Sequence, residues 1–379
     1  MALAILLSRV GHKVTLLERF TEPRPIGSGL MLQPAGLVAL QRIGLREAIE
    51  SLGHRVTRLH GVTGADRTIF DLAYGDLAPD LCAVAVHRAA LHGVLWEAFL
   101  RSGADLLRGR EVGSIDDPVL SAADLVVDAS GAGSVLRGFV SRQTERAFPY
   151  GAVWASVPDI GISPATLSQR YVGARVMLGY LPVGSRAAGE PPSAALFWSL
   201  RHDGYEHWRN RFTAWREDAR TLWPALAPVL NRLSGPDEFT HATYSHFSAR
   251  QPWRGNLMLI GDAAHATSPQ LGQGANHALI DAVVLTDALA SADDLQAAFA
   301  RYAAIRRGHV RFYQYASWLM TPFFQSDRRS LARLRDRAFY PMRRVPWLHR
   351  EMLRTLAGLK TGPFGAARAV DIVNRLAKP

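Results

Sequence analysis

Residues 257–285 read LMLIGDAAHATSPQLGQGANHALIDAVVL and are the most informative segment of the chain. Its opening apolar run stops at Gly261-Asp262, and apolar residues return at helical spacing only after Gly272 and Gly274. This order predicts a strand, a glycine-containing loop and a helix. An aspartate at the carboxyl end of such a strand is placed to accept hydrogen bonds from ligand hydroxyls, because open α/β sheets bind ligands at this edge.

The glycines of this stretch stand where the helix is predicted to begin. A helix N-terminus presents unpaired N–H groups and the positive end of the helix dipole. Glycine also lets a flat or anionic ligand approach the backbone closely. The same pattern occurs as a plain structural connection, so strand, loop and helix alone do not specify a ligand.

The full string is more specific, since it resembles the GD motif of FAD-dependent aromatic hydroxylases, the para-hydroxybenzoate hydroxylase-like flavoprotein monooxygenases. The resemblance implies that Asp262 meets the ribityl chain of FAD and that residues 269–276 run along the flavin ring. The cofactor contacts that it implies in this segment are Pro269, Gly272, Gly274, Ala275 and Asn276. It also implies an α/β fold, in which a Rossmann-like three-layer FAD-binding domain carries an inserted mixed-sheet substrate domain and a C-terminal helical segment.

The beginning of the chain reads as part of a dinucleotide-binding unit. Residues 2–10 are helical in pattern, and residues 14–17 form a short apolar strand that Glu18 closes, with Arg19 next. A carboxylate at this point binds the adenosine ribose hydroxyls, so we predict cofactor contacts for Glu18 and Arg19. The Gly-rich loop belongs about 20 residues earlier, before Met1. We therefore expect that the first strand and the loop are missing, and we interpret this as a start codon assigned too late.

Two further segments match the family in part. Arg88 opens a predicted helix after the strand that precedes it, and the resemblance implies a contact with FAD; on spacing alone it would be a surface residue. The turn at residues 24–32 contains Gly27 and Gly29, which could pass near the flavin or serve only as turn residues.

Residues 124–137 read DLVVDASGAGSVLR and resemble the DG motif, which links FAD to the nicotinamide cofactor in the family. The match is imperfect, because Ser130 stands where the motif has its aspartate and Asp128 where it has its leading glycine. A serine hydroxyl can still form a hydrogen bond but carries no charge. This departure weakens the expectation that NAD(P)H is the reductant.

The predicted organisation is two intertwined domains and a tail. Residues 1–147 and 251–300 form the FAD-binding domain, residues 148–250 the substrate domain, and residues 301–379 the C-terminal helical region. The substrate segment alternates strand-like runs with turns, and its aromatic residues could line an apolar pocket or fill a core: Trp154, Tyr180, Phe197, Trp198 and Trp215. The tail could be a packed helical cap or a lip that lies on a membrane surface.

Composition excludes several classes of protein. The chain has 379 residues, 48% of them hydrophobic, a net charge of +11 and one cysteine, Cys82. A disulfide framework is excluded, and a cytoplasmic location is expected, with membrane association as an option. No apolar run reaches the length of a transmembrane helix. We find no motif for nucleic-acid binding, metal binding or a hydrolase nucleophile.

The resemblance implies a reaction in which NAD(P)H reduces FAD, O₂ adds to the reduced flavin, and the resulting hydroperoxide hydroxylates an aromatic or lipophilic small molecule. No side chain is identified as a catalytic acid or base. Two alternatives stay open at this point: a flavin oxidoreductase that inserts no oxygen, and a degenerate homologue without catalysis.

Overall fold

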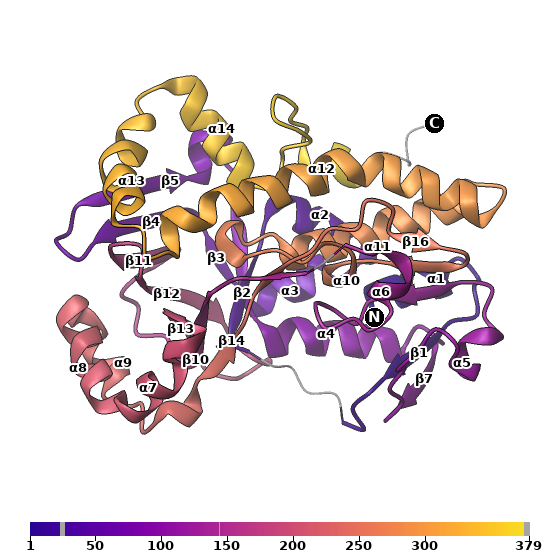
Figure 1. The fold of residues 1–379 in the computed structure, drawn as a ribbon, viewed down its shortest axis with the longest axis horizontal. Helices are drawn as coiled ribbons and strands as arrows, with labels where there is room; N and C mark the ends of the chain where they lie inside the picture. The colour runs from indigo at the N-terminus through magenta and orange to yellow at the C-terminus, as the bar shows by residue number, and fades with distance from the viewer. Residues whose placement is uncertain (23–26, 144, 375–379) are drawn as a thin grey trace.

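The computed structural model describes residues 1–22, 27–143 and 145–374. The predicted turn at 24–32 is therefore seen only from Gly27 onward, since residues 24–26 lie outside the described residues. The chain forms a mixed α/β structure with a large sheet and a helical C-terminal region (Figure 1). This confirms the predicted fold class.

The largest sheet has seven strands in the order β14-β10-β13-β12-β11-β4-β5. Only the β4–β11 pair is parallel, and the other neighbours are antiparallel. The strands are β4 (Arg58–Thr63), β5 (Thr68–Ala73), β10 (Tyr150–Pro158), β11 (Thr166–Val172), β12 (Val176–Gly184), β13 (Ser193–Arg201) and β14 (Thr240–Ala242). The sheet thus combines two strands from the segment 1–147 with strands from the predicted substrate segment. The domain division itself stays a prediction.

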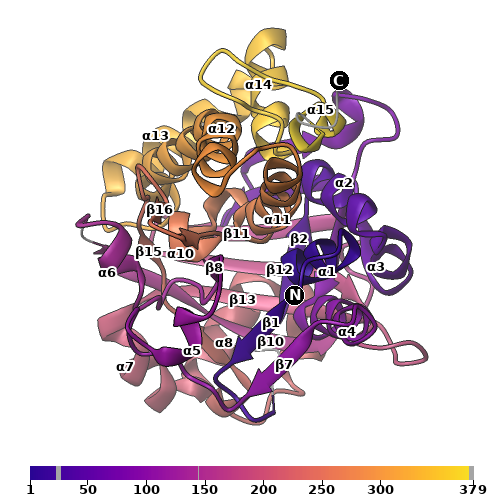
Figure 2. The same cartoon turned by 90° about the vertical axis from the view of Figure 1, so that its right-hand side faces the viewer.

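The large sheet separates two hydrophobic cores, because side chains alternate between its faces. Val153, Leu178 and Leu196 pack on one face against α7 (Tyr205–Asn210), α8 (Phe212–Leu222) and α9 (Ala227–Leu230). Trp154 and Phe197 belong to the other face and to the main core. Figure 2 shows the sheet between these helices below and the C-terminal helices above.

The dinucleotide-binding part contains three small sheets. In these, β1 (Thr15–Glu18) pairs in parallel with β7 (Asp105–Arg108), and β17 (Leu257–Leu259) lies between β8 (Val126–Asp128) and β16 (Trp253–Arg254). The third sheet has the order β2 (Gly29–Leu32), β6 (Ala83–His87), β3 (His54–Val56). Within the described residues no strand joins β1 to β8. That a strand and loop are missing before Met1 stays a prediction.

The helices of this part are α1 (Ala2–Arg9), α2 (Pro34–Ile43), α3 (Arg46–Leu52), α4 (Arg88–Leu100) and α11 (Gly274–Ala290). The sequence predicts a helix at residues 2–10, one that Arg88 opens and one that begins near Gly274, and α1, α4 and α11 agree with these, whereas α3 is not predicted. Apolar faces of α1, α2, α4 and α11 meet in the main core. Periodicity predicts them well because each contributes one apolar face to this core.

The C-terminal region consists of α12 (Leu295–Phe324), α13 (Arg329–Met342), α14 (Pro346–Leu356) and α15 (Ala369–Val373). Figure 1 shows α12 running across the upper half of the molecule, with α14 above its left part. The sequence predicts that this helix ends before Pro322, but it continues to Phe324. A proline this late removes one hydrogen bond without preventing the last turn, and the Gln325 N–H still bonds the Thr321 carbonyl at 2.7 Å.

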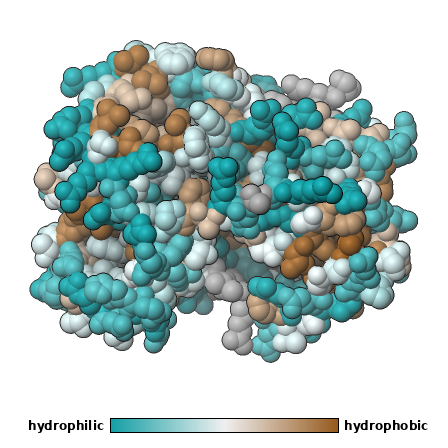
Figure 3. All heavy atoms as spheres, viewed as in Figure 1, coloured by the Kyte–Doolittle hydropathy of each residue, from teal (hydrophilic) through white to brown (hydrophobic). Residues whose placement is uncertain are grey.

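No helix in the described parts of the chain is long and apolar enough to cross a bilayer. On the face shown in Figure 3, apolar residues gather at the upper left, where Figure 1 places the C-terminal helices. Exposed apolar side chains on and beside these helices include Leu334, Val345 and Trp347.

Candidate functional site

The loop after β17 turns sharply at Gly261, which has a φ of 57°. A side chain is disfavoured at this φ, and a Cβ here would also lie 3.3 Å from the Ala278 Cβ of α11. Asp262 follows as the first residue of α10 (Asp262–His265). The glycine therefore brings the loop close to α11 and places Asp262 at the carboxyl end of the strand, as predicted.

A buried carboxylate holds this turn from behind. Asp281 of α11 has no exposed side-chain surface, and its carboxylate accepts hydrogen bonds from the Gly261 N–H at 2.8 Å and the His265 Nε2 at 2.6 Å. It also accepts one from the Arg306 Nε of α12 at 2.7 Å. Burial alone would raise the pKa of the Asp281 carboxyl, but His265 and Arg306 hold that pKa well below its usual range.

Arg137 holds the same loop from the other side. It opens α6 (Arg137–Val140), and its guanidinium donates to the carbonyls of Asp262 at 2.7 Å and Ala263 at 3.0 Å. The guanidinium also lies 4.1 Å from the centre of the Phe247 ring. Asp281 thus fixes the Gly261 N–H group, and Arg137 fixes the carbonyls of Asp262 and Ala263.

In the turn that resembles the DG motif, Ser130 forms hydrogen bonds within the turn itself. The Ser130 hydroxyl donates to the Asp128 carboxylate at 2.6 Å, and the Ser130 N–H donates to the same oxygen at 2.9 Å. Ser134 bonds the other oxygen of this carboxylate. Ser130 and Asp128 therefore stabilise the turn together, at the strand end beside the one that carries Asp262.

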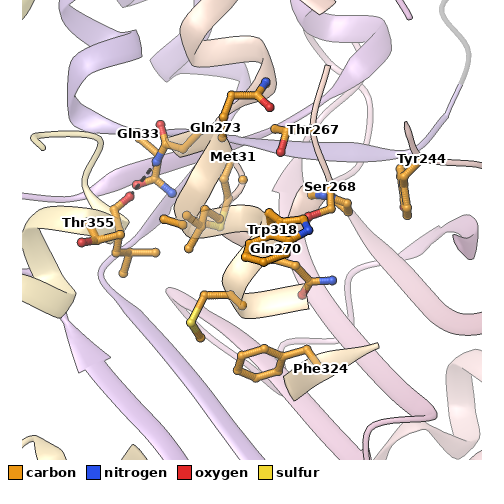
Figure 4. Close-up of a pocket in the computed structure, with 18 of the residues that line it drawn as sticks. Met31, Gln33, Tyr244, Thr267, Ser268, Gln270, Gln273, Trp318, Phe324 and Thr355 are labelled. Atoms are coloured by element: carbon orange, nitrogen blue, oxygen red, sulfur yellow. Dashed lines mark hydrogen bonds between the residues drawn. The ribbon is translucent and has the colours of Figure 1, made fainter. Parts of the chain in front are cut away.

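One large cavity lies between the loop, the large sheet and the C-terminal helices, with a volume of about 1980 Å³. Ligand pockets usually measure about 300–1,000 Å³, so this cavity has room for two ligands. Figure 4 shows Thr267, Ser268 and Gln270 of the loop on its wall, beside Trp318 of α12. The predicted site residues that line it are Arg88, Asp262, Pro269, Gly272, Gly274 and Ala275.

The Asp262 carboxylate faces this cavity. The surrounding protein raises the pKa of its carboxyl, and the charges of His265, Arg88 and Arg137 partly offset this rise. A Cβ on Gly274 would lie 3.7 Å from the Asp262 Oδ1, so the carboxylate stands next to the start of α11. An ionised carboxylate only accepts hydrogen bonds, and this one can therefore bind ligand hydroxyls.

Hydrogen-bond donors line the same cavity as the carboxylate. The first turn of α11 begins at Gly274 on the cavity wall, with the N–H groups and dipole of a helix N-terminus. Gln33 and Thr267 also line the cavity, and the Gln33 Nε2 and Thr267 Oγ1 are buried without a hydrogen-bond partner within the described residues. Buried polar groups are rarely left unpaired, so these atoms point to a polar ligand.

Three of the sequence-predicted residues do not line the cavity. Asn276 is fully buried, and its amide bonds the Gln33 N–H at 2.8 Å and the carbonyls of Met31 and Gly272 at 3.1 and 2.9 Å. It clamps α11 to the segment that joins β2 and α2. Glu18 and Arg19 lie at the end of β1, where Glu18 accepts from the Phe20 N–H. Cofactor contacts for these three residues stay predictions.

The substrate-segment aromatics divide between the two faces of the large sheet. Trp154 and Phe197 line the cavity, and Tyr244, which accepts a hydrogen bond from the Trp154 indole at 3.1 Å, lies beside them. Tyr180, Trp198 and Trp215 pack in the other core. Strand alternation could have separated Phe197 from Trp198, but it could not say which face meets the cavity.

Sequence reasoning missed the part played by α12. Its Gln314 donates to the His265 carbonyl at 2.7 Å, its Thr321 hydroxyl pairs with Ser268 at 2.8 Å, and Gln325 just beyond it accepts from Gln270 at 2.7 Å. No local pattern marks these contacts. Asp281 did carry a signal, because it is a charged residue within an otherwise apolar helical stretch.

Comparison with known proteins places this geometry among flavoproteins. A family model described as FAD binding domain matches residues 1–310. FAD-dependent urate hydroxylase of Mycolicibacterium vanbaalenii is 29% identical over 340 residues, which are 81% of this chain and 81% of the relative. The 6-methylpretetramide 4-monooxygenase of Streptomyces rimosus is 28% identical over 94% of this chain and 89% of its own.

Solved structures agree on the fold. A variant of HpxO from Klebsiella pneumoniae, solved in complex with FAD, superposes with a TM-score of 0.77 at 21% identity, covering 96% of each chain.

Proposed function

The chain belongs to the FAD binding domain family and is an FAD-dependent monooxygenase, and from this premise we propose how its residues hold the cofactor and an aromatic substrate in one cavity. The observation that carries the proposal is the position of Asp262. Its carboxylate stands beside the N-terminus of α11 on a cavity whose opposite wall is the apolar face of the large sheet.

The donors and acceptors of the cavity fit FAD. Asp262 would accept hydrogen bonds from the ribityl hydroxyls, and the first turn of α11 would face the pyrimidine edge of the ring. The unpaired Gln33 Nε2 and Thr267 Oγ1 would donate to ring or chain oxygens. Gly272 and Gly274 would let the ring lie close to the backbone. Arg88 offers a positive charge near Asp262, where the chain meets the anionic part of the cofactor.

When bound, FAD would supply the redox chemistry of the reaction, namely acceptance of a hydride from NAD(P)H and activation of O₂ for transfer of one oxygen atom. The protein supplies orientation and electrostatics for this chemistry. The α11 N-terminus would stabilise negative charge that develops on the ring edge next to it. Ser268 bonds Thr321 of α12, and Gln270 bonds Gln325 just after this helix. These two bonds would hold α12 against the cavity, where it would exclude bulk water.

The relatives do not favour the two alternatives. The two curated relatives described above are named as a hydroxylase and a monooxygenase. Neither name describes a flavin reductase that inserts no oxygen. Contact of the C-terminal helices with a membrane surface stays a prediction, and co-sedimentation with anionic vesicles would test it.

The test compares the purified protein with Asp262→Ala and with Asp218→Ala, a matched change at an exposed aspartate of α8. We expect the unchanged protein and Asp218→Ala to retain FAD and to oxidise NAD(P)H faster when an aromatic substrate is present. Oxygen uptake should accompany a product that is heavier by one oxygen atom. We expect Asp262→Ala to lose most of the flavin. Equal flavin retention in all three proteins would contradict the proposed site.

A further inference from the structure

The cavity wall that the large sheet contributes is a single row of residues. Register pairs join one residue from each strand, which from β14 to β5 are Thr240, Trp154, Phe197, Gly179, Gln169, Gly61 and Phe70. Directly paired residues of neighbouring strands point to the same face of a sheet. Every member of the row that has a side chain lines the cavity.

Two glycines let aromatic rings of this row lie close to the sheet. A Cβ on Gly179 would stand 1.9 Å from the Phe197 Cζ, and a Cβ on Gly61 would stand 2.5 Å from the Phe70 Cζ. Each phenylalanine ring therefore lies across the glycine of the neighbouring strand. Trp154 stacks on Phe197 with ring centres 4.5 Å apart and planes 31° from parallel. The row from Thr240 to Phe70 therefore forms a flat, largely aromatic surface without projecting side chains, which we call the floor of the cavity.

The floor is long. Neighbouring strands lie about 4.8 Å apart, so the five steps from β10 to β5 span roughly 24 Å of sheet. This is several times the width of one aromatic ring. Phe324 of α12 contacts the Phe70 end of the row, with ring centres 6.1 Å apart. A single-ring substrate would leave much of the remaining floor uncovered, and a row of fused rings would cover it.

The floor carries no charge. Among the described residues that the seven strands contribute to the cavity there is no Asp, Glu, Lys or Arg. The lining arginines at 88, 142, 146, 307 and 311 all come from outside these seven strands. A substrate carboxylate placed on the floor would lose its hydration without gaining a partner, which is costly. The floor therefore selects uncharged ligands.

Gln169 supplies one polar group near the middle of the row. Its Nε2 donates to the Met177 sulfur at 3.2 Å, and no other acceptor for it is found among the residues that the structure describes. A thioether is a weak acceptor, so a ligand oxygen can replace it with a gain in hydrogen bonding. Gln169 pairs with Gly179 on one side and Gly61 on the other, and its half-buried side chain lines the cavity.

We propose that the substrate is an uncharged, planar aromatic molecule of three or more fused rings that lies along this row, with a carbonyl or hydroxyl oxygen against the Gln169 amide. The inference rests on the proposed function, since it names the substrate class of the same cavity. Gln169 is then a specificity-determining residue that touches the substrate.

The first test titrates the FAD-loaded protein with 1,8-dihydroxyanthraquinone and with 3-hydroxybenzoate, following the change in flavin absorbance. We expect the tricyclic probe to bind at least 100-fold more tightly. Equal affinity, or tighter binding of the hydroxybenzoate, would overturn the inference. Oxygen uptake with NAD(P)H is measured alongside, because turnover of the hydroxybenzoate alone would leave the monooxygenase function intact and reject only this substrate class.

The second test uses Gln169→Leu, with Gln251→Leu as a matched change at an exposed glutamine outside the cavity. We expect Gln169→Leu to weaken anthraquinone binding about threefold to tenfold, the effect of one net hydrogen bond. Binding of anthracene, which has no oxygen, should not change, and flavin content should match the unchanged protein. Equal losses for both probes, or no loss for either, would reject the role of Gln169.

Discussion

Arg306 of α12 and Asp281 of α11 form an ion pair, with a 2.7 Å separation between the Arg306 Nε and the Asp281 Oδ1, that is almost completely buried behind the loop carrying Asp262. The same guanidinium bonds His277 and His309, and His309 bonds the Gly358 carbonyl at 3.1 Å. The pair thus joins α11, α12 and the C-terminal segment at one point. The ion pair therefore holds α11, which follows the loop carrying Asp262, against α12, which lines the cavity.

Arg306→Met should strongly destabilise the protein, because it leaves the Asp281 carboxylate buried without the Arg306 guanidinium. Removing one member of a buried pair costs about 3–5 kcal/mol. Urea unfolding of the FAD-free protein measures this, with Arg307→Met as the control, since Arg307 is exposed. A loss below about 1 kcal/mol, the range of surface ion pairs, would show that the pair does not contribute as the structure indicates.

Stability should fall as the pH drops from about 6.5, the ordinary pKa of histidine. Burial, with a smaller effect of the Arg186 charge, lowers the pKa of His87 to about 4. Burial together with the His309 and Arg306 charges also lowers the pKa of His277, well below its usual value. The unfolded chain therefore binds protons that the folded chain excludes, and stability is lost as the pH falls toward the folded-state pKa values.

The measurement for this prediction is the urea midpoint at several pH values between 7.5 and 4.5. His87→Asn keeps a side-chain acceptor for the Ala89 N–H at the start of α4 but does not titrate. It should show a shallower pH dependence than the unchanged protein, whereas His207→Asn, at an exposed site, should not. Identical profiles for all three proteins would remove His87 from the explanation.

Asn276→Ala should lower stability even in the absence of FAD. The substitution leaves the buried Gln33 N–H and the Met31 and Gly272 carbonyls without their partner. Each unsatisfied buried group costs about 1–3 kcal/mol. Thermal unfolding of FAD-free protein separates this role from direct cofactor contact. If the variant were less stable only when FAD is bound, Asn276 would act on the cofactor and not as a clamp.

Arg137→Lys should weaken FAD binding without abolishing the fold. Lysine keeps the charge but cannot donate to the Asp262 and Ala263 carbonyls in the same planar arrangement. Loss of one hydrogen bond from a charged donor corresponds to about a tenfold or larger rise in the FAD dissociation constant. Arg254→Lys is the matched control, because Arg254 also bonds a carbonyl and packs on a phenylalanine but lies at the surface. Equal affinities in the two variants would show that Arg137 does not position the loop.

The sequence by itself determined the local elements and the position of the central motif. The strand β17 (Leu257–Leu259), the turn at Gly261 and the helix from Gly274 follow from apolar periodicity and glycine placement, which depend on neighbours within a few residues. Six of the nine predicted cofactor residues line one cavity for the same reason, since most of them belong to that continuous stretch.

Only the tertiary structure decided what surrounds this stretch. Asn276 and Arg137 act through backbone groups more than 100 residues away, and the floor of the cavity joins residues from seven strands whose order does not follow the chain. Such contacts depend on strand register and on how α12 packs across α11. These are set by the burial of whole faces, and a one-residue shift in register would turn the floor toward the other core.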